Sequence, residues 1–285
     1  MTHLLCFGFG FTARTFVARL DKRAWKASAT SRDAEGVAEI NAQGFHGLLF
    51  DGTLQIAPDV THLLISAPPD ENGDPVLQIF HEQLQRFSKQ LKWVGYLSTT
   101  GVYGDRGGDW VDEDSPLEPT TMRGERRLKA ERSWLRLHKD FGVPVHLFRL
   151  AGIYGPGRNQ LLNVGDGSAK RIIKPGQIFS RIHVEDVAGV LAASIAKPNP
   201  GRAYNVCDDE PCPPQEVVEF AADLLGLTPP PQIPFEQANL STMAKSFYAD
   251  SKRVSNKRIK AELSYKLLYP NYRDGLRALK STLTV

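Results

Sequence analysis

The chain has 285 residues, of which 41% are hydrophobic and 24% are charged, and it carries a net charge of +3 at pH 7. This length and apolar content suffice for one large α/β domain or for a domain with a smaller lobe. The small net charge argues against a nucleic-acid partner, and no apolar run approaches the length of a membrane span.

The cysteines and histidines indicate the expected compartment. The three cysteines, Cys6, Cys207 and Cys212, contain no Cys-x-x-Cys pair, and the seven histidines are scattered along the chain. We therefore expect a reduced, cytoplasmic protein without a metal site. The apolar run at 4–7 and the glycine turn after it stand at the extreme N-terminus, so no signal peptide is expected ahead of them.

The N-terminal stretch predicts a strand, a glycine turn and a helix. Residues 4–7 are an apolar run typical of a buried strand, and residues 12–20 carry apolar side chains at helical spacing. Gly8 would make the turn, Gly10 would let the backbone approach a pyrophosphate, and the helix N-terminus would supply N–H groups. Ala13 takes the place of a third glycine, which this fingerprint allows. The expected cofactor contacts here are Gly8, Phe9, Gly10, Phe11 and Thr12. The alternative is a glycine-rich turn without a ligand.

Strands and helices alternate through the first 150 residues. Further strands are expected at 25–30, 45–50, 61–66, 93–98 and 143–150. Helices are expected at 33–43, 75–90 and 122–139. The strands are apolar on both faces, which is typical of a parallel sheet covered by helices on each side. We therefore predict an α/β fold, a Rossmann-type doubly wound parallel sheet with a smaller C-terminal substrate lobe.

The pattern changes beyond residue 150, where glycines become frequent. Residues 171–182 predict a hairpin around Pro175-Gly176. The other expected features are helices at 184–196 and 214–225, a strand at 203–206, an irregular Pro-rich stretch at 228–234, a basic tail at 251–281 and a solvated basic helix face at 252–260. We predict a dinucleotide-binding domain at 1–150, to which 181–206 return, and a substrate lobe made of 151–180 and 207–285.

Residues that directly follow the strands are candidate ligand contacts. Right-handed crossovers place the carboxyl ends of all parallel strands along one edge of the sheet, where ligands bind. Beyond the glycine turn, the candidate cofactor contacts at this edge are Ser31, Arg32, Asp51, Gly52, Ala67 and Pro68.

Several segments together resemble the extended short-chain dehydrogenase/reductases, the NAD-dependent epimerase/dehydratase group. They are Leu-Ser-Thr-Thr-Gly-Val-Tyr-Gly at 97–104, Asp-Glu-Asp-Ser-Pro-Leu-Glu-Pro at 112–119, Arg-Leu-Ala-Gly-Ile-Tyr-Gly-Pro-Gly at 149–157, Ile-His-Val-Glu-Asp-Val at 182–187 and Ala-Tyr-Asn-Val at 203–206. The resemblance covers most of the chain. It implies a nicotinamide cofactor, a small-molecule substrate, a lobe that closes over this substrate, and an Asp51 that meets the adenine amino group. It leaves a homodimer open, since the family often dimerises through a helix pair.

The catalytic signature of that family, Tyr-x-x-x-Lys, is absent. Arg123 stands at the tyrosine position and Arg127 at the lysine position. An arginine stays protonated at neutral pH and cannot act as the proton-transfer base. Arg127 could still bond the nicotinamide ribose, and Arg123 could bind an anionic substrate group.

Other hydroxyl groups could replace the missing tyrosine. Thr99 aligns with the residue that orients the substrate carbonyl, although a threonine at a strand end can equally bond the backbone. Tyr103 is the first substitute proton donor to test, ahead of Tyr154, and each has the alternative of a packed phenol. Four further polar residues near the lobe could bind a ligand, or they could instead have a structural role or lie solvated on the surface. They are Arg158, Arg171, His183 and Asp186.

The end of the second strand bears on the choice of cofactor. Relatives selective for NAD usually carry an acidic residue there, whereas this chain has Ser31 and Arg32. A hydroxyl and a cation suit the 2′-phosphate of NADP, so we predict NADP. Asp33 follows directly and would favour NAD if the register differs by one residue.

Two function hypotheses remain open. The first is an NAD(P)-dependent oxidoreductase or epimerase that acts on a sugar-like or other hydroxyl or carbonyl compound. The second is a non-catalytic NAD(P)-binding sensor or regulatory protein, favoured by the arginines that replace the proton-transfer pair. Fold alone does not choose between them.

Overall fold

The structure is a computed structural model that describes residues 1–282. The chain forms two compact units. The first comprises Met1–Thr99, Glu125–Arg149 and Val187–Tyr204, and the second comprises Thr100–Gly124, Leu150–Asp186 and the residues from Asn205 onward. Residues 100–124 thus group with the second unit, whereas the sequence pattern assigns them to the dinucleotide-binding domain.

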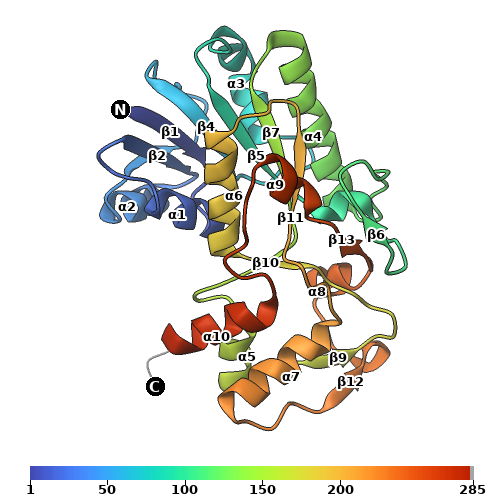
Figure 1. Cartoon of the computed structure of the whole chain (residues 1–285). Coiled ribbons are helices and arrows are strands. Elements are labelled where there is room, and N and C mark those ends of the chain that lie inside the picture. The colour runs from blue at the N-terminus through green and yellow to red at the C-terminus, as the bar shows by residue number, and fades with distance from the viewer. Residues whose placement is uncertain (283–285) are drawn as a thin grey trace. The chain divides into compact units, whose positions relative to one another are not determined.

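The first unit is built around a seven-stranded sheet in the order β11-β7-β5-β4-β1-β2-β3 (Figure 1). Its strands are β1 (Thr2–Phe7), β2 (Trp25–Ser31), β3 (His46–Leu49), β4 (Val60–Ile65), β5 (Trp93–Thr99), β7 (Val145–Leu150) and β11 (Ala203–Val206). β1 pairs in parallel with both β2 and β4, so that Leu5 lies opposite Ser28 and Leu63. The predicted Rossmann-type doubly wound parallel sheet is confirmed.

Helices cover both faces of this sheet. They are α1 (Phe11–Ala18), α2 (Ala34–Ala42), α3 (Pro75–Arg86), α4 (Met122–Phe141) and α6 (Val184–Ala196). Strand order runs one way from β1 to β3 and the other way from β4 to β7, so right-handed crossovers put α1 and α2 opposite α3 and α4. Tyr96 packs with Phe80 of α3 and Trp134 of α4 in one core. Trp93, three residues earlier in β5, points to the other face, where its Nε1 donates to Ser194 of α6 at 3.0 Å.

The second unit contains short strands and small helices. The strands form three parallel pairs: β8 (Gly152–Tyr154) with β10 (Arg181–His183), β9 (Arg171–Ile173) with β12 (Gln232–Pro234), and β6 (Trp110–Val111) with β13 (Arg253–Val254). The helices are η1 (Thr100–Tyr103), α5 (Gln160–Gly165), α7 (Pro214–Leu225), η2 (Phe235–Gln237), α8 (Thr242–Phe247), α9 (Lys257–Glu262) and α10 (Tyr272–Thr282). α5, α7 and α10 enclose a core that contains Tyr154, Val217 and Leu276.

The predicted hairpin at 171–182 is wrong. The two flanks of the Pro175-Gly176 turn do not pair with each other, because each finds a partner distant in sequence. Phe179 exchanges backbone hydrogen bonds with Cys212, and the Ile178 N–H donates to Ser251 Oγ. The Pro-rich stretch expected to be irregular supplies β12, the partner of β9.

Candidate functional site

The glycine turn stands between the carboxyl ends of β1 and β4, where strand order reverses. Gly8 has a φ of +89°, and a Cβ there would lie 3.2 Å from the Ala67 N. The Gly8 N–H donates to Thr30 Oγ1 at 2.9 Å, and Ala67 N–H donates to Phe7 O at 2.9 Å. Only glycine fits this position without strain. The turn is therefore held rigidly against two neighbouring strands.

Space is open above the start of α1. A Cβ at Gly10 would meet no atom within 4 Å. In the part of the chain that the structure describes, no side chain caps α1 at Gly10. The first N–H groups of the helix, on Phe11 and Thr12, are thus available to an acceptor from outside. Phe9 differs from its neighbours, since its ring is buried against Phe45 at 5.6 Å, which leaves its backbone as the part that can face a ligand.

The end of β2 presents a hydroxyl and a cation, while the nearby carboxylate is already engaged. Asp33 Oδ1 accepts the Gly36 N–H at 2.7 Å as the N-cap of α2, and it accepts the Ser31 hydroxyl at 3.4 Å. Arg32 is exposed and has no ion-pair partner among residues 1–282. An anion near this strand end would therefore meet the exposed Arg32 guanidinium next to the Asp33 carboxylate.

The turn after β3 is organised by Asp51. Its Oδ1 accepts the Thr53 hydroxyl at 2.7 Å, the Thr53 N–H at 2.8 Å and the Leu54 N–H at 3.1 Å. The Thr53 hydroxyl, followed by the backbone donors, lowers the pKa of Asp51, so this carboxylate is ionised at neutral pH. Gly52 has open space around its Cα, and Pro68 is exposed after β4. The structure brings Gly8 and Ala67 into contact and places Asp51, Gly52 and Pro68 at the same edge of the sheet.

Arg127 points into the protein. It is 8% exposed, its Nη1 donates to the Leu97 carbonyl at the end of β5, and its guanidinium lies 5.6 Å from the Tyr96 ring centroid. Its buried Nε has no hydrogen-bond partner in residues 1–282. The arginine at the family's lysine position therefore secures the end of β5 in this structure.

Arg123 has a different environment, because it is exposed in the first turn of α4. Its guanidinium carbon lies 5.8 Å from the ring centroid of Phe247 in α8. The next residue, Gly124, packs so closely that a Cβ would lie 2.8 Å from the Gly101 carbonyl oxygen. This contact fixes the start of α4 against η1 and so fixes the position of Arg123.

Both candidate tyrosines are buried within the second unit. The Tyr103 hydroxyl donates to Asn205 Oδ1 at 2.7 Å, and the side chain is fully buried. Tyr154 is 9% exposed and belongs to the core of the second unit, where its ring packs against Gly275 so tightly that a Cβ there would overlap it. The Tyr154 hydroxyl has no hydrogen-bond partner among the described residues. In this conformation each phenol has a packing role, and a catalytic role for Tyr103 stays a prediction to be tested.

A buried polar network that the sequence pattern did not indicate holds the end of β5. Ser98 Oγ donates to Glu131 Oε1 of α4 at 2.5 Å, and Arg149 Nη2 of β7 lies 2.9 Å from Glu131 Oε2. The Glu131 side chain is 1% exposed and that of Arg149 is 5% exposed. Thr99, the next residue, is half-buried at the end of this braced strand. The sequence signal for this network is Arg149 inside the otherwise apolar strand β7, whereas Glu131 is one of many charged residues in α4.

The segment after α8 supports the loop that follows β5. The Lys252 Nζ donates to the Gly104 carbonyl at 2.7 Å and pairs with Asp250 at 3.1 Å, and Asp250 accepts the Thr120 hydroxyl. Lys252 is 8% exposed, and burial lowers its pKa. The expectation of a solvated basic helix face at 252–260 is therefore wrong at Lys252, because partners distant in sequence bury it.

The other polar residues considered as ligand contacts have different partners and do not form one group. Arg171 pairs with Glu219 at 2.6 Å, and Arg158 is exposed in the turn after β8. Asp186 accepts the backbone N–H groups of Leu268 at 2.7 Å and Tyr269 at 3.0 Å. Asp186 thus anchors the segment that leads to α10. Among residues 1–282 there is no group of three or more His, Cys, Asp or Glu side chains arranged to hold a metal ion, and no helix with the length and apolar character needed to span a bilayer.

Fold and site together define a Rossmann-type dinucleotide-binding protein: a glycine turn and an uncapped helix N-terminus lie at the reversal of strand order. Residues 8–207 match the model of the NAD dependent epimerase/dehydratase family. The chain belongs to this family.

Individual relatives extend the comparison. A solved structure of a functionally unknown conserved protein from Silicibacter pomeroyi DSS is 52% identical, with a TM-score of 0.92 and coverage of 99% of each chain. Protein YeeZ of Escherichia coli K12 is 27% identical over 281 residues, which are 93% of this chain and 95% of YeeZ. Human epimerase family protein SDR39U1, solved with NADPH, is 18% identical with a TM-score of 0.78 over 99% of this chain and 100% of its own. A 3-diazoavenalumate denitrifying reductase from Streptomyces sp is 26% identical over 183 residues, 60% of this chain and 59% of the reductase.

Proposed function

We propose that this protein binds NADP(H) along the carboxyl edge of β1, β2 and β4. The single observation that carries the proposal is the turn from Gly8 to Gly10: a positive-φ glycine locked between two strands, then open space at an uncapped helix start. A dinucleotide pyrophosphate is the anion that such a turn accommodates. The family membership supports the same cofactor class.

The 2′-phosphate form is favoured by the end of β2. Asp33 Oδ1 caps α2 and accepts the Ser31 hydroxyl, so one oxygen of this carboxylate is already engaged within the chain. The exposed Arg32 remains as the cation that meets a phosphate. The solved structure of SDR39U1 contains NADPH, which is consistent with this choice.

Equilibrium binding of NADPH and NADH to the wild type and to three variants tests the cofactor proposal. Gly10→Val places a side chain where the pyrophosphate must approach, and we expect it to abolish binding of both cofactors. Gly165→Val is the matched control, because its added Cβ also meets nothing within 4 Å but lies in α5 of the second unit. Arg32→Ala should weaken NADPH about 10- to 100-fold and leave NADH unchanged. Unchanged NADPH affinity in folded Gly10→Val protein would refute the proposal.

For the reaction, we favour an oxidoreductase or epimerase acting on a hydroxyl or carbonyl group of a sugar-like or other small molecule. The family and the similarity to a reductase support this class. Arg123 is not the proton donor in this proposal, and Thr99, at the end of β5, orients a substrate carbonyl. Arg123 then contacts an anionic group of the substrate and contributes to binding rather than to proton transfer.

The second candidate is a non-catalytic NADP(H) sensor. Two contacts favour it: the Tyr103 hydroxyl donates to Asn205, and Arg127 donates to the Leu97 carbonyl. A panel of carbonyl and hydroxyl compounds, followed by the absorbance of the reduced nicotinamide, separates the two functions. Tight NADPH binding without hydride transfer to or from any compound would favour the sensor.

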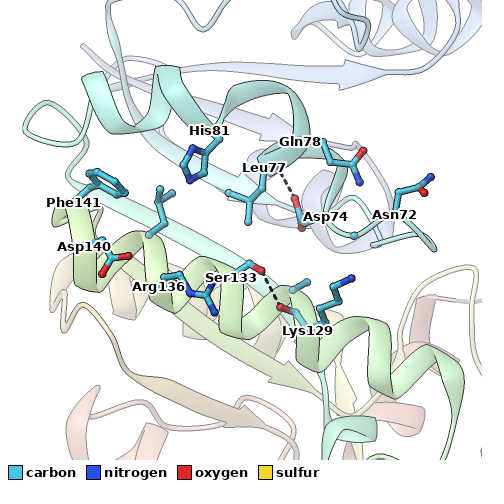
Figure 2. A pocket seen from close by; sticks show the side chains of 13 residues that line it. Asn72, Asp74, Leu77, Gln78, His81, Lys129, Ser133, Arg136, Asp140 and Phe141 are labelled. Carbon is cyan, nitrogen blue, oxygen red and sulfur yellow. Dashed lines mark hydrogen bonds between the residues drawn. The ribbon is translucent and has the colours of Figure 1, made fainter.

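A homodimer through α3 and α4 is the assembly we propose. The two helices border a groove of about 290 Å³, and Figure 2 shows His81 of α3 and Phe141 of α4 facing each other across one end of it. Their rings are 6.2 Å apart, and Phe141, which lines the groove, is an exposed apolar side chain. Light scattering should show a dimer that Phe141→Glu converts to a monomer. A monomeric wild type would contradict this assembly.

A further inference from the structure

Three aromatic side chains of the second unit form a row. The ring of Phe235 lies 5.2 Å from that of Tyr248, which lies 5.3 Å from that of Phe179. These residues come from η2, from the position after α8 and from the segment before β10. All three are half-buried. We call them the aromatic row.

A cation stands at each end of the aromatic row. The Lys174 Nζ lies 5.2 Å from the Phe235 ring centroid, and the Arg181 guanidinium carbon lies 5.9 Å from that of Phe179. Lys174 donates to the Tyr248 carbonyl, and Arg181 donates to the Phe179 carbonyl at 3.1 Å. Neither cation forms a salt bridge with a carboxylate in residues 1–282. Aromatic rings and backbone carbonyl groups therefore stabilise both positive charges.

Three acidic residues that follow β11, at 208–210, do not pair with Lys174 or Arg181. Burial raises the pKa of Asp208 to about 8 despite the attraction of Arg181, so this carboxyl is mostly neutral at pH 7. The acidic residues that follow are committed elsewhere, since Asp209 pairs with Lys260 and Glu210 with Arg273. None of these three acidic residues is therefore a charged partner of Lys174 or Arg181.

An exposed aromatic face adjoins this region. Phe247 directly precedes Tyr248 of the aromatic row and is 51% exposed. The Arg123 guanidinium lies over its ring, 5.8 Å from the centroid. A cation above an exposed ring can hold an anionic group while the ring offers a stacking surface. Both side chains are in the second unit, so this surface exists within one compact part of the chain.

We propose that the surface formed by Phe247, Arg123 and the aromatic row binds an aromatic carboxylate. The ligand ring stacks on Phe247, and its carboxylate meets the Arg123 guanidinium. The assignment names a substrate class for the proposed oxidoreductase or epimerase and rests on that function, because Arg123 stands where the family's tyrosine meets substrate. Binding here is non-covalent and needs no cofactor.

Ligand titrations followed by NMR test the assignment with three small probes. Benzoate carries both the ring and the charge, cyclohexanecarboxylate only the charge, and benzamide only the ring. We expect benzoate to bind about 5- to 10-fold more tightly than either of the others. Phe247→Leu should remove the preference for benzoate over cyclohexanecarboxylate, and Arg123→Gln the preference for benzoate over benzamide. Trp110→Leu, at another exposed ring of the second unit, and Arg126→Gln, in the same helix as Arg123, are the matched controls.

The outcomes separate this inference from the proposed function. Equal affinities of the three probes, or no effect of either Phe247→Leu or Arg123→Gln in folded protein, would overturn the aromatic-carboxylate site while leaving NADPH binding untouched. The expected probe pattern in a protein that fails to bind NADPH would uphold the site and refute the cofactor proposal. Circular dichroism of each variant establishes that it is folded.

Discussion

Glu131→Gln probes the buried network that braces β5. In the wild type the Glu131 carboxylate accepts Ser98 Oγ at 2.5 Å and pairs with Arg149 at 2.9 Å, and both charged side chains are at least 95% buried. Glutamine keeps the shape but removes the negative charge. The Arg149 guanidinium then stays buried without its carboxylate. Breaking one side of such a pair is strongly destabilising, whereas forming it contributes little net stability.

The expected loss is about 3 kcal/mol, because typical values for removing one partner of a buried pair are about 3–5 kcal/mol and glutamine retains a hydrogen-bonding oxygen. At about 2 °C per kcal/mol for a domain of this size, the thermal midpoint should fall by about 6 °C. Differential scanning calorimetry measures this shift. The end of β5 should also loosen, so hydrogen exchange at the Thr99 amide should accelerate.

Two control variants test whether burial of the ion pair causes the loss of stability in Glu131→Gln. Glu39→Gln removes the same charge from the exposed pair with Arg14, whose side chains are 49% and 57% exposed, and should shift the midpoint by no more than about 1–2 °C. The double variant Glu131→Leu/Arg149→Met removes both charges and should recover most of the loss. Equal shifts for Glu131→Gln and Glu39→Gln would show that the network carries no special energetic weight.

Three further predictions concern single positions in the second unit. Tyr103→Phe leaves Asn205 Oδ1 without its phenol donor, and the free energy of unfolding should fall by about 1–2 kcal/mol in a denaturant titration. If turnover is found, a fall in kcat at constant KM would identify Tyr103 as the proton donor. An unchanged kcat would exclude it. Burial raises the pKa of Asp208 to about 8, so the native state holds a proton that the unfolded state releases near pH 4. Stability should therefore fall as pH rises from about 4 towards about 8, and Asp208→Asn should flatten that slope; an identical slope in the variant would contradict the buried neutral carboxyl. At Gly104, φ is +71° and an added Cβ would overlap a backbone carbonyl, whereas at Gly107 φ is +57° and the space is open. Only Gly104→Ala should therefore lower the thermal midpoint by several degrees. A similar shift for Gly107→Ala would show that backbone strain alone is responsible.

The sequence alone determined the part of the fold that depends on local periodicity. Apolar runs and helical spacing placed β1, β2, β4, β5 and the long helix α4 within a few residues of their observed bounds. The glycine turn was equally readable, because Gly8 and Gly10 are needed for backbone reasons that hold wherever a strand turns into such a helix. Alternation of these elements then implied a parallel sheet and its ligand-binding edge.

Tertiary structure decided everything that depends on partners distant in sequence. The Pro175-Gly176 turn looked like a hairpin, but each flank bonds to a strand far along the chain, and no local pattern encodes such pairings. Lys252 looked solvated, yet the Gly104 carbonyl and Asp250 hold it inside the second unit. Charge and hydropathy describe what a residue is able to do in water. The chain that packs around it decides whether that charge meets solvent, a carbonyl or a ligand.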